Sequence, residues 1–234
     1  MDDNDNLLWP QPPSSWRFEA DSPHVWAVTL CVSPEALRRL AYMLSPDEVE
    51  RAERFRFDLD RQRFIAGRGL LRRILGRYLS AEPSDIEFDY GPNGKPLLAG
   101  DFARSGLLFN LAHCEDLALV AVIRRGMIGV DVERVRSLPD ADDLASRFFS
   151  PRERSRYRDC QFGERPAAFF NIWTRKEAWL KATGEGIGCE LDKVEPADLC
   201  RLHDLAPAAG FAGALALAPD GRRPNCWRWN NDYD

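Results

Sequence analysis

The sequence predicts an α+β protein made of two similar α/β lobes. When the 234-residue chain is shifted by 105 residues, the strand-like segment 25–30 falls on 130–135. The same shift places the Ser-Pro pair at 45–46 on the pair at 150–151. With 44% apolar residues, the chain is large enough to bury one large core or two small ones. Landmarks that share one offset without a gap indicate an internal duplication.

Each Ser-Pro pair predicts the start of a helix. The serine caps the first turn with its hydroxyl, and proline fits the first helical position because no N–H is needed there. Long helices should follow at 61–79 and 168–183, where position 72 falls on Glu177 under the same shift. The first of these segments holds six arginines and no acid. We interpret it either as a solvated helix face or as a basic surface for an anionic partner.

Strand patterns complete each half. An Asn-Gly step within 91–96 predicts a tight turn. A boundary after residue 127 divides the chain into an N-terminal lobe, 1–127, and a C-terminal lobe, 128–234, with a ligand groove between them. Strands are expected at 85–90, 106–113, 117–124, 127–135, 190–195 and 211–218.

Composition and charge narrow the class of protein. No apolar run approaches the roughly 18 residues of a membrane span, and the acidic, proline-rich start is unlike a secretory signal. The six cysteines are scattered without a C-x-x-C pair, which favours a reduced cytoplasmic protein over a disulfide or zinc framework. A net charge of −5 argues against bulk nucleic-acid binding. Two lobes within one chain favour a monomer, with neither membrane nor nucleic acid as a partner.

The segment 129–135, GVDVERV, carries two acids on one face of a strand. Asp131 and Glu133 alternate with buried valines and therefore lie about 6.5–7 Å apart along the strand. Two neighbouring carboxylates repel each other unless water or a cation relieves them. A soluble surface is one interpretation of this pair, and a cation site is the other.

The helix expected at 168–183 supplies a third acid. At about 100° per residue, Glu177 falls within the apolar arc of this helix, between Phe170 and Trp173. A buried charge costs several kcal/mol unless it is paired or bound to a metal. An i,i+4 pair with Lys181 explains the spacing, at about 0.2–0.5 kcal/mol, but not the inward direction. Three carboxylates form an oxygen site suited to Mg²⁺, with Mn²⁺ as an alternative.

Basic and glycine residues surround the expected groove. Lys95 leaves the Asn-Gly turn, and His113 ends the strand expected at 106–113. A turn lysine is usually solvated and a lone histidine is more often structural, but both converging on a carboxylate groove would suit a polyphosphate ligand. The glycines at 184, 186 and 188 end the long helix, either as a mobile loop beside the site or as a plain C-cap.

These segments resemble the sequence signature of 4′-phosphopantetheinyl transferases. GVDVERV is followed about forty residues later by NIWTRKEAWLKATGEGIG, and both are similar to the paired motifs of that family. Upstream, RFIAGRGLLRRIL, GPNGKP and FNLAH resemble its other three blocks, in the family's order. The match covers roughly residues 45–190. The two-lobe length is similar to the Sfp type, and the N-terminal region resembles cyanobacterial members.

The resemblance implies a pseudo-dimer of two α/β lobes with the active site between them. It also implies transfer of the 4′-phosphopantetheine arm of coenzyme A (CoA) to a serine of an apo acyl or peptidyl carrier protein, with release of 3′,5′-ADP. The implied Mg²⁺ ligands are Asp131, Glu133 and Glu177. Glu177 matches the residue that deprotonates the serine, directly or through a bound water, and Lys181 matches the lysine that assists the leaving pyrophosphate. Lys95 and His113 match phosphate-contacting positions, and Arg51 and Arg63 match residues at the nucleotide end.

Two positions depart from the family's pattern. Ala112 stands where a serine often precedes the histidine, which removes a hydroxyl that would bond a phosphate. Glu48 stands where some relatives carry lysine, so recognition of the 3′-phosphate would rest on Arg51 and Arg63. Two other functions use the same acids: a metal-dependent phosphohydrolase of CoA or nucleotides, and a non-catalytic CoA-binding module of the same fold.

Overall fold

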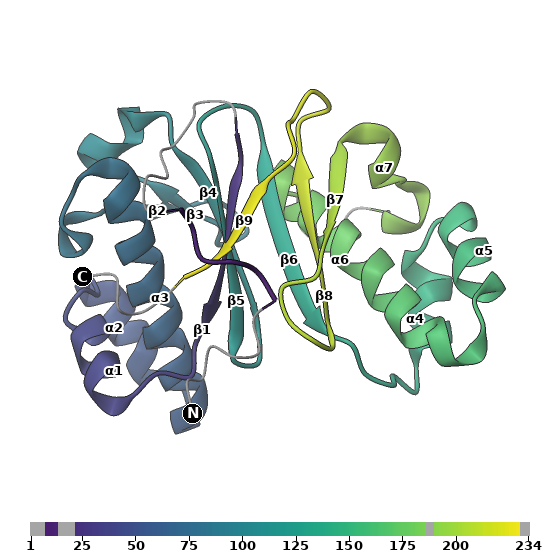
Figure 1. Ribbon diagram of the computed structural model, residues 1–234, viewed down its shortest axis with the longest axis horizontal. Helices are drawn as coiled ribbons and strands as arrows, with labels where there is room; N and C mark the ends of the chain where they lie inside the picture. Colours follow the sequence, from purple (N-terminus) through teal and green to yellow (C-terminus); the bar gives the residue numbers. More distant parts are fainter. Residues whose placement is uncertain (1–7, 14–21, 186–189, 230–234) are drawn as a thin grey trace.

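Two sheets form the centre of the computed structural model, which describes residues 8–13, 22–185 and 190–229 (Figure 1). The first sheet has the strand order β4-β5-β1-β9, the second has the order β6-β8-β7, and β2 pairs with β3 in a separate hairpin. Helices α1, α2 and α3 lie outside the first sheet, and α4 to α7 lie on the side of the second (Figure 1). The predicted α+β class is confirmed.

The bounds of these elements follow the chain. The strands are β1 His24–Thr29, β2 Phe88–Tyr90, β3 Pro96–Leu98, β4 Leu108–Cys114, β5 Leu117–Ile123, β6 Ile128–Arg134, β7 Arg201–Leu205, β8 Phe211–Leu217 and β9 Asn225–Arg228. The helices are α1 Pro34–Ala41, α2 Pro46–Glu53, α3 Asp58–Leu79, α4 Ala141–Phe148, α5 Pro151–Asp159, α6 Arg165–Thr183 and α7 Pro196–Leu199.

The layers are helix, sheet, sheet and helix. Strand β5 illustrates this order, because its two faces pack against different layers. Ala118, Val120 and Val122 pack toward α3, whereas Leu119 and Ala121 pack toward the second sheet. A strand buried on both faces reads as a continuous apolar run rather than an alternating one. On the far face of the second sheet, α6 packs against β8. The two sheets therefore share one core, and each has a second core beneath its helices.

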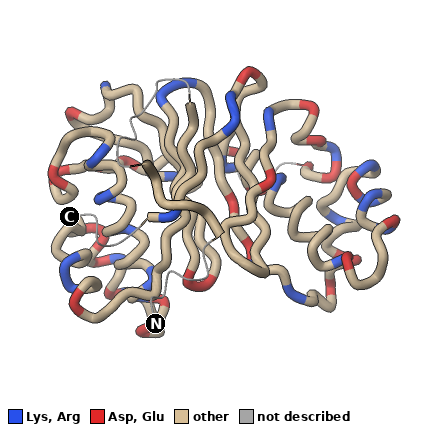
Figure 2. Tube along the Cα trace, in the orientation of Figure 1, with Lys and Arg blue, Asp and Glu red and all other residues tan. Residues whose placement is uncertain are grey.

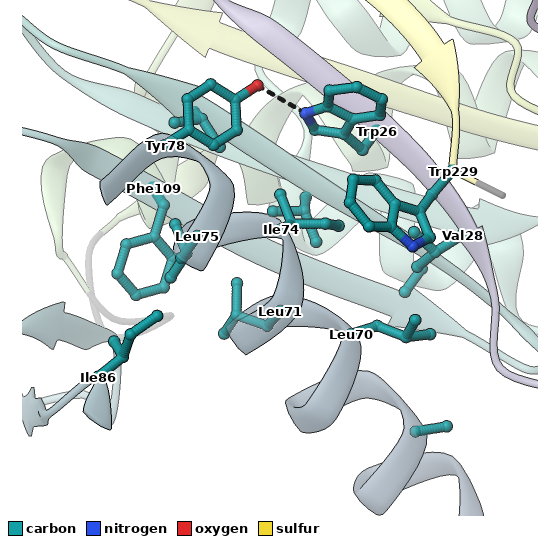
Figure 3. Close-up of a cluster of buried hydrophobic side chains, with 14 of the residues drawn as sticks. Trp26, Val28, Leu70, Leu71, Ile74, Leu75, Tyr78, Ile86, Phe109 and Trp229 are labelled. Carbon is teal, nitrogen blue, oxygen red and sulfur yellow. Dashed lines mark hydrogen bonds between the residues drawn. The ribbon is translucent and has the colours of Figure 1, made fainter. Parts of the chain in front are cut away.

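The core beneath α3 is rich in aromatic residues (Figure 3). The indole N–H of Trp26 on β1 donates to the hydroxyl of Tyr78 at the end of α3, at 2.7 Å. Since buried polar groups need a partner, this bond fixes the end of the helix over the sheet. The aliphatic side chains that pack beside it from α3 are Leu70, Leu71, Ile74 and Leu75.

Both Ser-Pro helix starts are confirmed. Helices α2 and α5 begin at the predicted prolines, and each has a capping box between its serine and a first-turn glutamate. These glutamates, Glu48 and Glu153, keep the 105-residue offset, and both are buried. Glu48 pairs with Arg68 and Arg72 of α3, and Glu153 pairs with Lys176 of α6. Each half thus holds its long helix to the preceding short helix through a buried ion pair.

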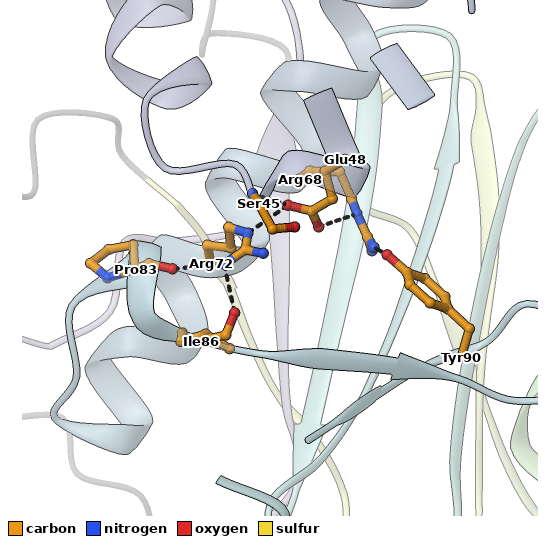
Figure 4. A network of polar contacts seen from close by, with 7 residues as sticks. All are labelled: Ser45, Glu48, Arg68, Arg72, Pro83, Ile86 and Tyr90. Carbon is orange, nitrogen blue, oxygen red and sulfur yellow. Dashed lines mark hydrogen bonds and ion pairs between the residues drawn. The ribbon is translucent and has the colours of Figure 1, made fainter. Parts of the chain in front are cut away.

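The basic segment 61–79 is not a solvated face along its whole length. Arg72 is fully buried and Arg68 is 5% exposed, both against the carboxylate of Glu48 (Figure 4). Arg72 also donates to two carbonyl oxygens of the loop after α3, at 3.0 and 2.7 Å. The solvated-face interpretation is therefore wrong for these two arginines. Both are buried, and both pair with Glu48, a residue of α2 that lies outside the segment. Elsewhere, charged residues lie mainly on the outer helices and loops (Figure 2).

The segment 190–195 is not the strand that the sequence predicts. It contains a 3₁₀ turn, Leu191–Lys193, and the strand of this region is β7. The ammonium of Lys176 donates to the carbonyl oxygens of Leu191 and Val194, at 2.7 and 2.8 Å. Backbone carbonyls used in this way are not available to a sheet, so a buried lysine from α6 overrides the local strand pattern.

Strand β9 crosses from the second half to the first sheet. It pairs in parallel with β1, with His24 opposite Asn225. The predicted division after residue 127 falls between β5 and β6. However, β9, which belongs to the lobe predicted as 128–234, is part of the first sheet together with strands of the other lobe. Trp227 and Trp229 pack on Trp26 there, which gives β9 an aromatic anchor. No helix in the described ranges is long and apolar enough to cross a membrane.

Candidate active site

Strand β6 and helix α6 bring the predicted acids together. β6 carries Asp131 and Glu133, and α6 carries Glu177 and Lys181. The ammonium of Lys181 contacts Oδ1 of Asp131 at 2.6 Å. Gly129 allows the two backbones to meet, since a Cβ at this position would lie 2.1 Å from a carbonyl oxygen of α6. Helix and strand are therefore in direct contact at the level of the site.

Burial is the main influence on the pKa values of Asp131 and Glu177. Asp131 is 5% exposed, and burial raises its pKa to about 7 against the opposing attraction of Lys181. The charges of Glu177 and Glu133 raise that pKa further. Burial also raises the pKa of Glu177, with Lys181 opposing the shift and Glu133 adding to it. The three carboxylates lie in one another's field, which is the repulsion that a shared cation relieves.

One oxygen of Asp131 has no hydrogen-bond partner among the described residues. Oδ1 is taken by Lys181, whereas Oδ2 is buried without a donor. An unpartnered buried carboxylate oxygen is costly, and a hard divalent cation supplies the missing contact. Across the described ranges, no group of three or more His, Cys, Asp or Glu side chains is arranged as a metal site. The acids therefore fit a cation by donor chemistry and charge, not by a preformed geometry.

A cavity of about 460 Å³ opens beside Glu177, the one of the three acids among its described lining residues. Its walls come from both halves, with the β2–β3 turn and β4 on one side and the last turns of α6 on the other. Glu177 and Lys181 line it together with Asn110 and Lys95. The volume is within the usual range of small-molecule sites. A ligand in this cavity would contact residues of α6 and residues of the β2–β3 turn.

Lys95 and His113, the predicted phosphate-contacting residues, lie near the acids. Lys95 lines the cavity, and its ammonium donates to the carbonyl oxygens of Lys181 and Ile128, at 2.5 and 3.1 Å. Burial lowers the pKa of Lys95. His113 is the last residue but one of β4, and its pKa is lowered first by burial and then by the charges of Lys181 and Arg63. Lys95 therefore contacts the end of α6 directly, whereas His113 is influenced by the charge of Lys181 on that helix.

The two arginines predicted at the nucleotide end lie on α3 and α2. Arg63 pairs with Asp116 at 2.8 Å, a hydrogen bond that raises the pKa of Arg63, and its charge reaches His113. Arg51 lies over the ring of Phe64, 5.3 Å from the centroid. No contact found in the described part of the chain joins Arg51 to the acids. The structure thus links Arg63 to Asp116 and His113 and leaves Arg51 on the neighbouring helix, and neither arginine is among the described residues that line the cavity.

Two asparagines at the site are not predicted from the sequence. Oδ1 of Asn110 on β4 accepts a hydrogen bond from the backbone N–H of Val130 on β6, at 2.8 Å. The amide of Asn93, in the β2–β3 turn, donates to the carbonyl oxygen of Gly184 at 2.8 Å. Asn110 lies in the block FNLAH and Asn93 in the block GPNGKP, where the strand pattern, the turn pattern and the family resemblance do not indicate a partner for either amide. Each ties the first half of the chain to the second.

The glycine-rich segment after α6 is described in part. Gly184 ends the helix in the left-handed conformation, with φ +79°, and its N–H donates to the carbonyl oxygen of Leu180 at 2.9 Å. This arrangement is a glycine C-cap. The mobile-loop alternative concerns Gly186 and Gly188, which lie outside the described residues.

We expect the metal-free protein to lose stability as the pH rises from about 4 to 7. Folded Asp131 keeps its proton up to a pKa of about 7, whereas its ordinary pKa is 3.8. Between these values the folded state binds more protons than the unfolded state, so rising pH costs on the order of 4 kcal/mol from this group. Thermal unfolding in EDTA across this range measures the loss. The variant Asp131→Asn should flatten the profile, and equal slopes in both proteins would contradict the assignment.

Comparisons with known proteins identify the family. Residues 127–229 match the 4′-phosphopantetheinyl transferase superfamily, and residues 31–124 match the 4′-phosphopantetheinyl transferase N-terminal region. The chain is 43% identical over 232 residues to the 4′-phosphopantetheinyl transferase HetI of Nostoc sp., a match that covers 94% of this chain and 98% of HetI. It is 36% identical over 191 residues to a putative 4′-phosphopantetheinyl transferase of Synechocystis sp., covering 79% and 77% of the two chains.

A more distant relative, the 4′-phosphopantetheinyl transferase Sfp of Bacillus subtilis, is 30% identical over 172 residues, or 74% of this chain and 72% of Sfp. The predicted resemblance, including its cyanobacterial character, is therefore confirmed. None of these relatives supports the phosphohydrolase alternative. The chain belongs to the 4′-phosphopantetheinyl transferase superfamily.

Proposed function

We propose that this phosphopantetheinyl transferase binds CoA in the cavity between its two halves and a divalent cation at Asp131, Glu133 and Glu177. The observation that supports the proposal is the buried carboxylate of Asp131, with one oxygen unpartnered and two further acids in its field. Mg²⁺ is the proposed cation, with Mn²⁺ as an alternative, because both prefer oxygen ligands. When bound, it would neutralise charge on the pyrophosphate of CoA.

The proposed reaction is attack of a carrier-protein serine on the β-phosphorus of CoA. A bond forms between phosphorus and the serine oxygen, the bond to the bridging pyrophosphate oxygen breaks, and 3′,5′-ADP leaves. Glu177 accepts the serine proton, since its carboxylate lines the cavity in which CoA is proposed to bind. The ammonium of Lys181, held beside Asp131, would stabilise charge on the departing phosphate.

Four basic residues are proposed to hold the phosphates and the nucleotide end. His113 and Arg63 share one charged neighbourhood, and Lys95 lines the cavity. Recognition of the 3′-phosphate is assigned to Arg63 and Arg51, because Glu48 is buried in its ion pairs and presents no charge to the cavity. The phosphates and the proposed cation would then be contacted from both halves of the chain.

We further propose that the protein works as a cytoplasmic monomer on an apo acyl or peptidyl carrier protein, without a nucleic-acid or membrane partner. The acids and the basic residues that face them come from the two halves of a single chain. A second copy is therefore not needed to assemble the residues named above.

Mass spectrometry of intact carrier proteins tests the proposal. The protein is incubated with CoA, Mg²⁺ and a panel of apo carriers of the fatty-acid, polyketide and peptide-synthase types. We expect one carrier serine to gain the phosphopantetheinyl group, 3′,5′-ADP to be released, and EDTA to stop both. A lack of gain with every carrier would count against transfer, and a gain insensitive to EDTA would count against the cation. Steady CoA cleavage without a carrier would favour a hydrolase.

A further inference from the structure

The turn between β2 and β3 reaches across to the last turn of α6. The Asn93 amide donates to the carbonyl oxygen of Gly184 at 2.8 Å, and the Lys95 ammonium donates to that of Lys181 at 2.5 Å. The last carbonyls of a helix have no partner within the helix itself. The first half of the chain therefore caps the helix of the second half, with one neutral donor and one cation. A cation is also the favourable charge at the C-terminal end of a helix.

Lys95 joins this helix to strand β6 as well. Its ammonium also donates to the carbonyl oxygen of Ile128, the first residue of β6, at 3.1 Å. One ammonium group therefore bridges the two elements that carry all the acids of the proposed cation site. A lysine has three N–H donors, so one remains for a ligand in the cavity after both carbonyls are bound.

The contact between β6 and α6 is closest beside this bridge. A Cβ at Gly129 would lie 2.1 Å from the carbonyl oxygen of Ala178 and 2.4 Å from the nitrogen of Ala182. Close packing sets the distance between strand and helix here. The hydrogen bonds from the β2–β3 turn add directional contacts to the same end of the helix.

Lys181 is the residue that connects these hydrogen bonds to the acids of the proposed site. Its carbonyl oxygen is held by Lys95, and its ammonium contacts Oδ1 of Asp131 at 2.6 Å. Movement of the last helical turn would therefore displace the ammonium from the acid. Glu177, one helical turn earlier, would move with it. An error of about 1 Å in such groups is enough to cost a factor of about 100 in rate.

We propose that Asn93 and Lys95 are positioning residues, which hold Lys181 and Glu177 in place against Asp131 by capping α6 across the two halves. The inference rests on the proposed function of those three residues. It gives Asn93 a role in the reaction and adds a second role to Lys95 beside the expected phosphate contact. Substitution of Asn93 tests positioning more directly than substitution of Lys95, because the Asn93 amide donates to the helix end and no phosphate contact is proposed for it.

Steady-state kinetics separates positioning from phosphate binding. In Asn93→Ala we expect kcat to fall about tenfold while the KM for CoA stays within about twofold, because the phosphate contacts remain. Asn93→Asp keeps the turn preference and the size of the side chain but replaces the donor by an acceptor, so it should show the same loss. Lys95→Met should lower kcat and raise KM, and Lys95→Arg should recover part of kcat. Lys193→Met is the matched control, at an exposed lysine that is not among the described residues lining the cavity.

Hydrogen exchange gives a readout that does not depend on activity. Amides of residues 178–184 should exchange at least about tenfold faster in both Asn93 variants, while β5 amides keep their protection. Unchanged exchange in this turn, or an unchanged kcat in both variants, would overturn the inference. A rise in KM alone would also overturn it, since that pattern belongs to a binding contact. Absence of transfer by the parent protein would instead overturn the proposed function, and the exchange result would still decide whether the turn holds the helix.

Discussion

Replacing Glu177 by alanine should lower the rate of phosphopantetheinyl transfer by a factor of about 10² or more while the protein stays folded. Glu177 lies in the wall of the cavity with a raised pKa, so the variant loses both the proposed base and one proposed ligand. Asp131→Ala should have a loss of similar size, because Asp131 is the most buried of the three acids. Glu133 is more exposed, at 29% of its side chain, and water should replace it at a smaller cost.

Initial rates of carrier modification, with thermal midpoints recorded alongside, measure these effects. Glu190→Ala is the matched control, because Glu190 is 71% exposed and pairs only with Lys193 among the contacts found in the described chain. It should leave the rate unchanged. Unfolding of Asp131→Ala or Glu177→Ala would assign these acids to the fold instead. A loss in Glu133→Ala equal to that in Asp131→Ala would contradict the ranking of the ligands.

The largest effect on stability should come from Glu48→Ala. The variant leaves Arg68 and Arg72 buried without their carboxylate, and breaking a buried pair from one side costs about 3–5 kcal/mol. Helix α2 also loses the side chain that closes its capping box. Urea unfolding of parent and variant, compared at equal m-values, gives the difference in free energy of unfolding.

Glu35→Ala provides the comparison on the surface. Glu35 pairs with Arg39 at 2.5 Å, but the two side chains are 67% and 63% exposed. Exposed pairs contribute about 0–1 kcal/mol, so this variant should unfold close to the parent. If the two variants lost equal amounts of stability, burial would not be what makes the Glu48 pairs important.

Local chemistry explains the parts of the fold that the sequence predicts well. The capping serines at 45 and 150 and the following prolines act within one helical turn, so the starts of α2 and α5 are readable directly. The alternation around Asp131 places its strand correctly for the same reason. The segment 190–195 fails because its carbonyls are bound by Lys176, a residue of another element.

The candidate site also has features that local sequence patterns predict and features that only the packing of distant elements creates. The identity and spacing of Asp131, Glu133, Glu177 and Lys181 are local features of two motifs, and the resemblance assigns their chemistry. That Asp131 is buried with an unpartnered oxygen depends on how α6 packs on β6, which no local pattern contains. The bridge from Lys95 to Lys181 spans 86 residues, so the sequence offers two lysines and no sign that one holds the other.

By itself, the sequence determined the class of fold, the starts of two helices and the strand that carries Asp131, because caps and alternation act over a few residues. Only the tertiary structure decided which charges are buried, which helix end is capped from the other half, and that β9 joins the first sheet. These properties depend on contacts between elements far apart in the chain, and the free energy of burying a group is set by what surrounds it.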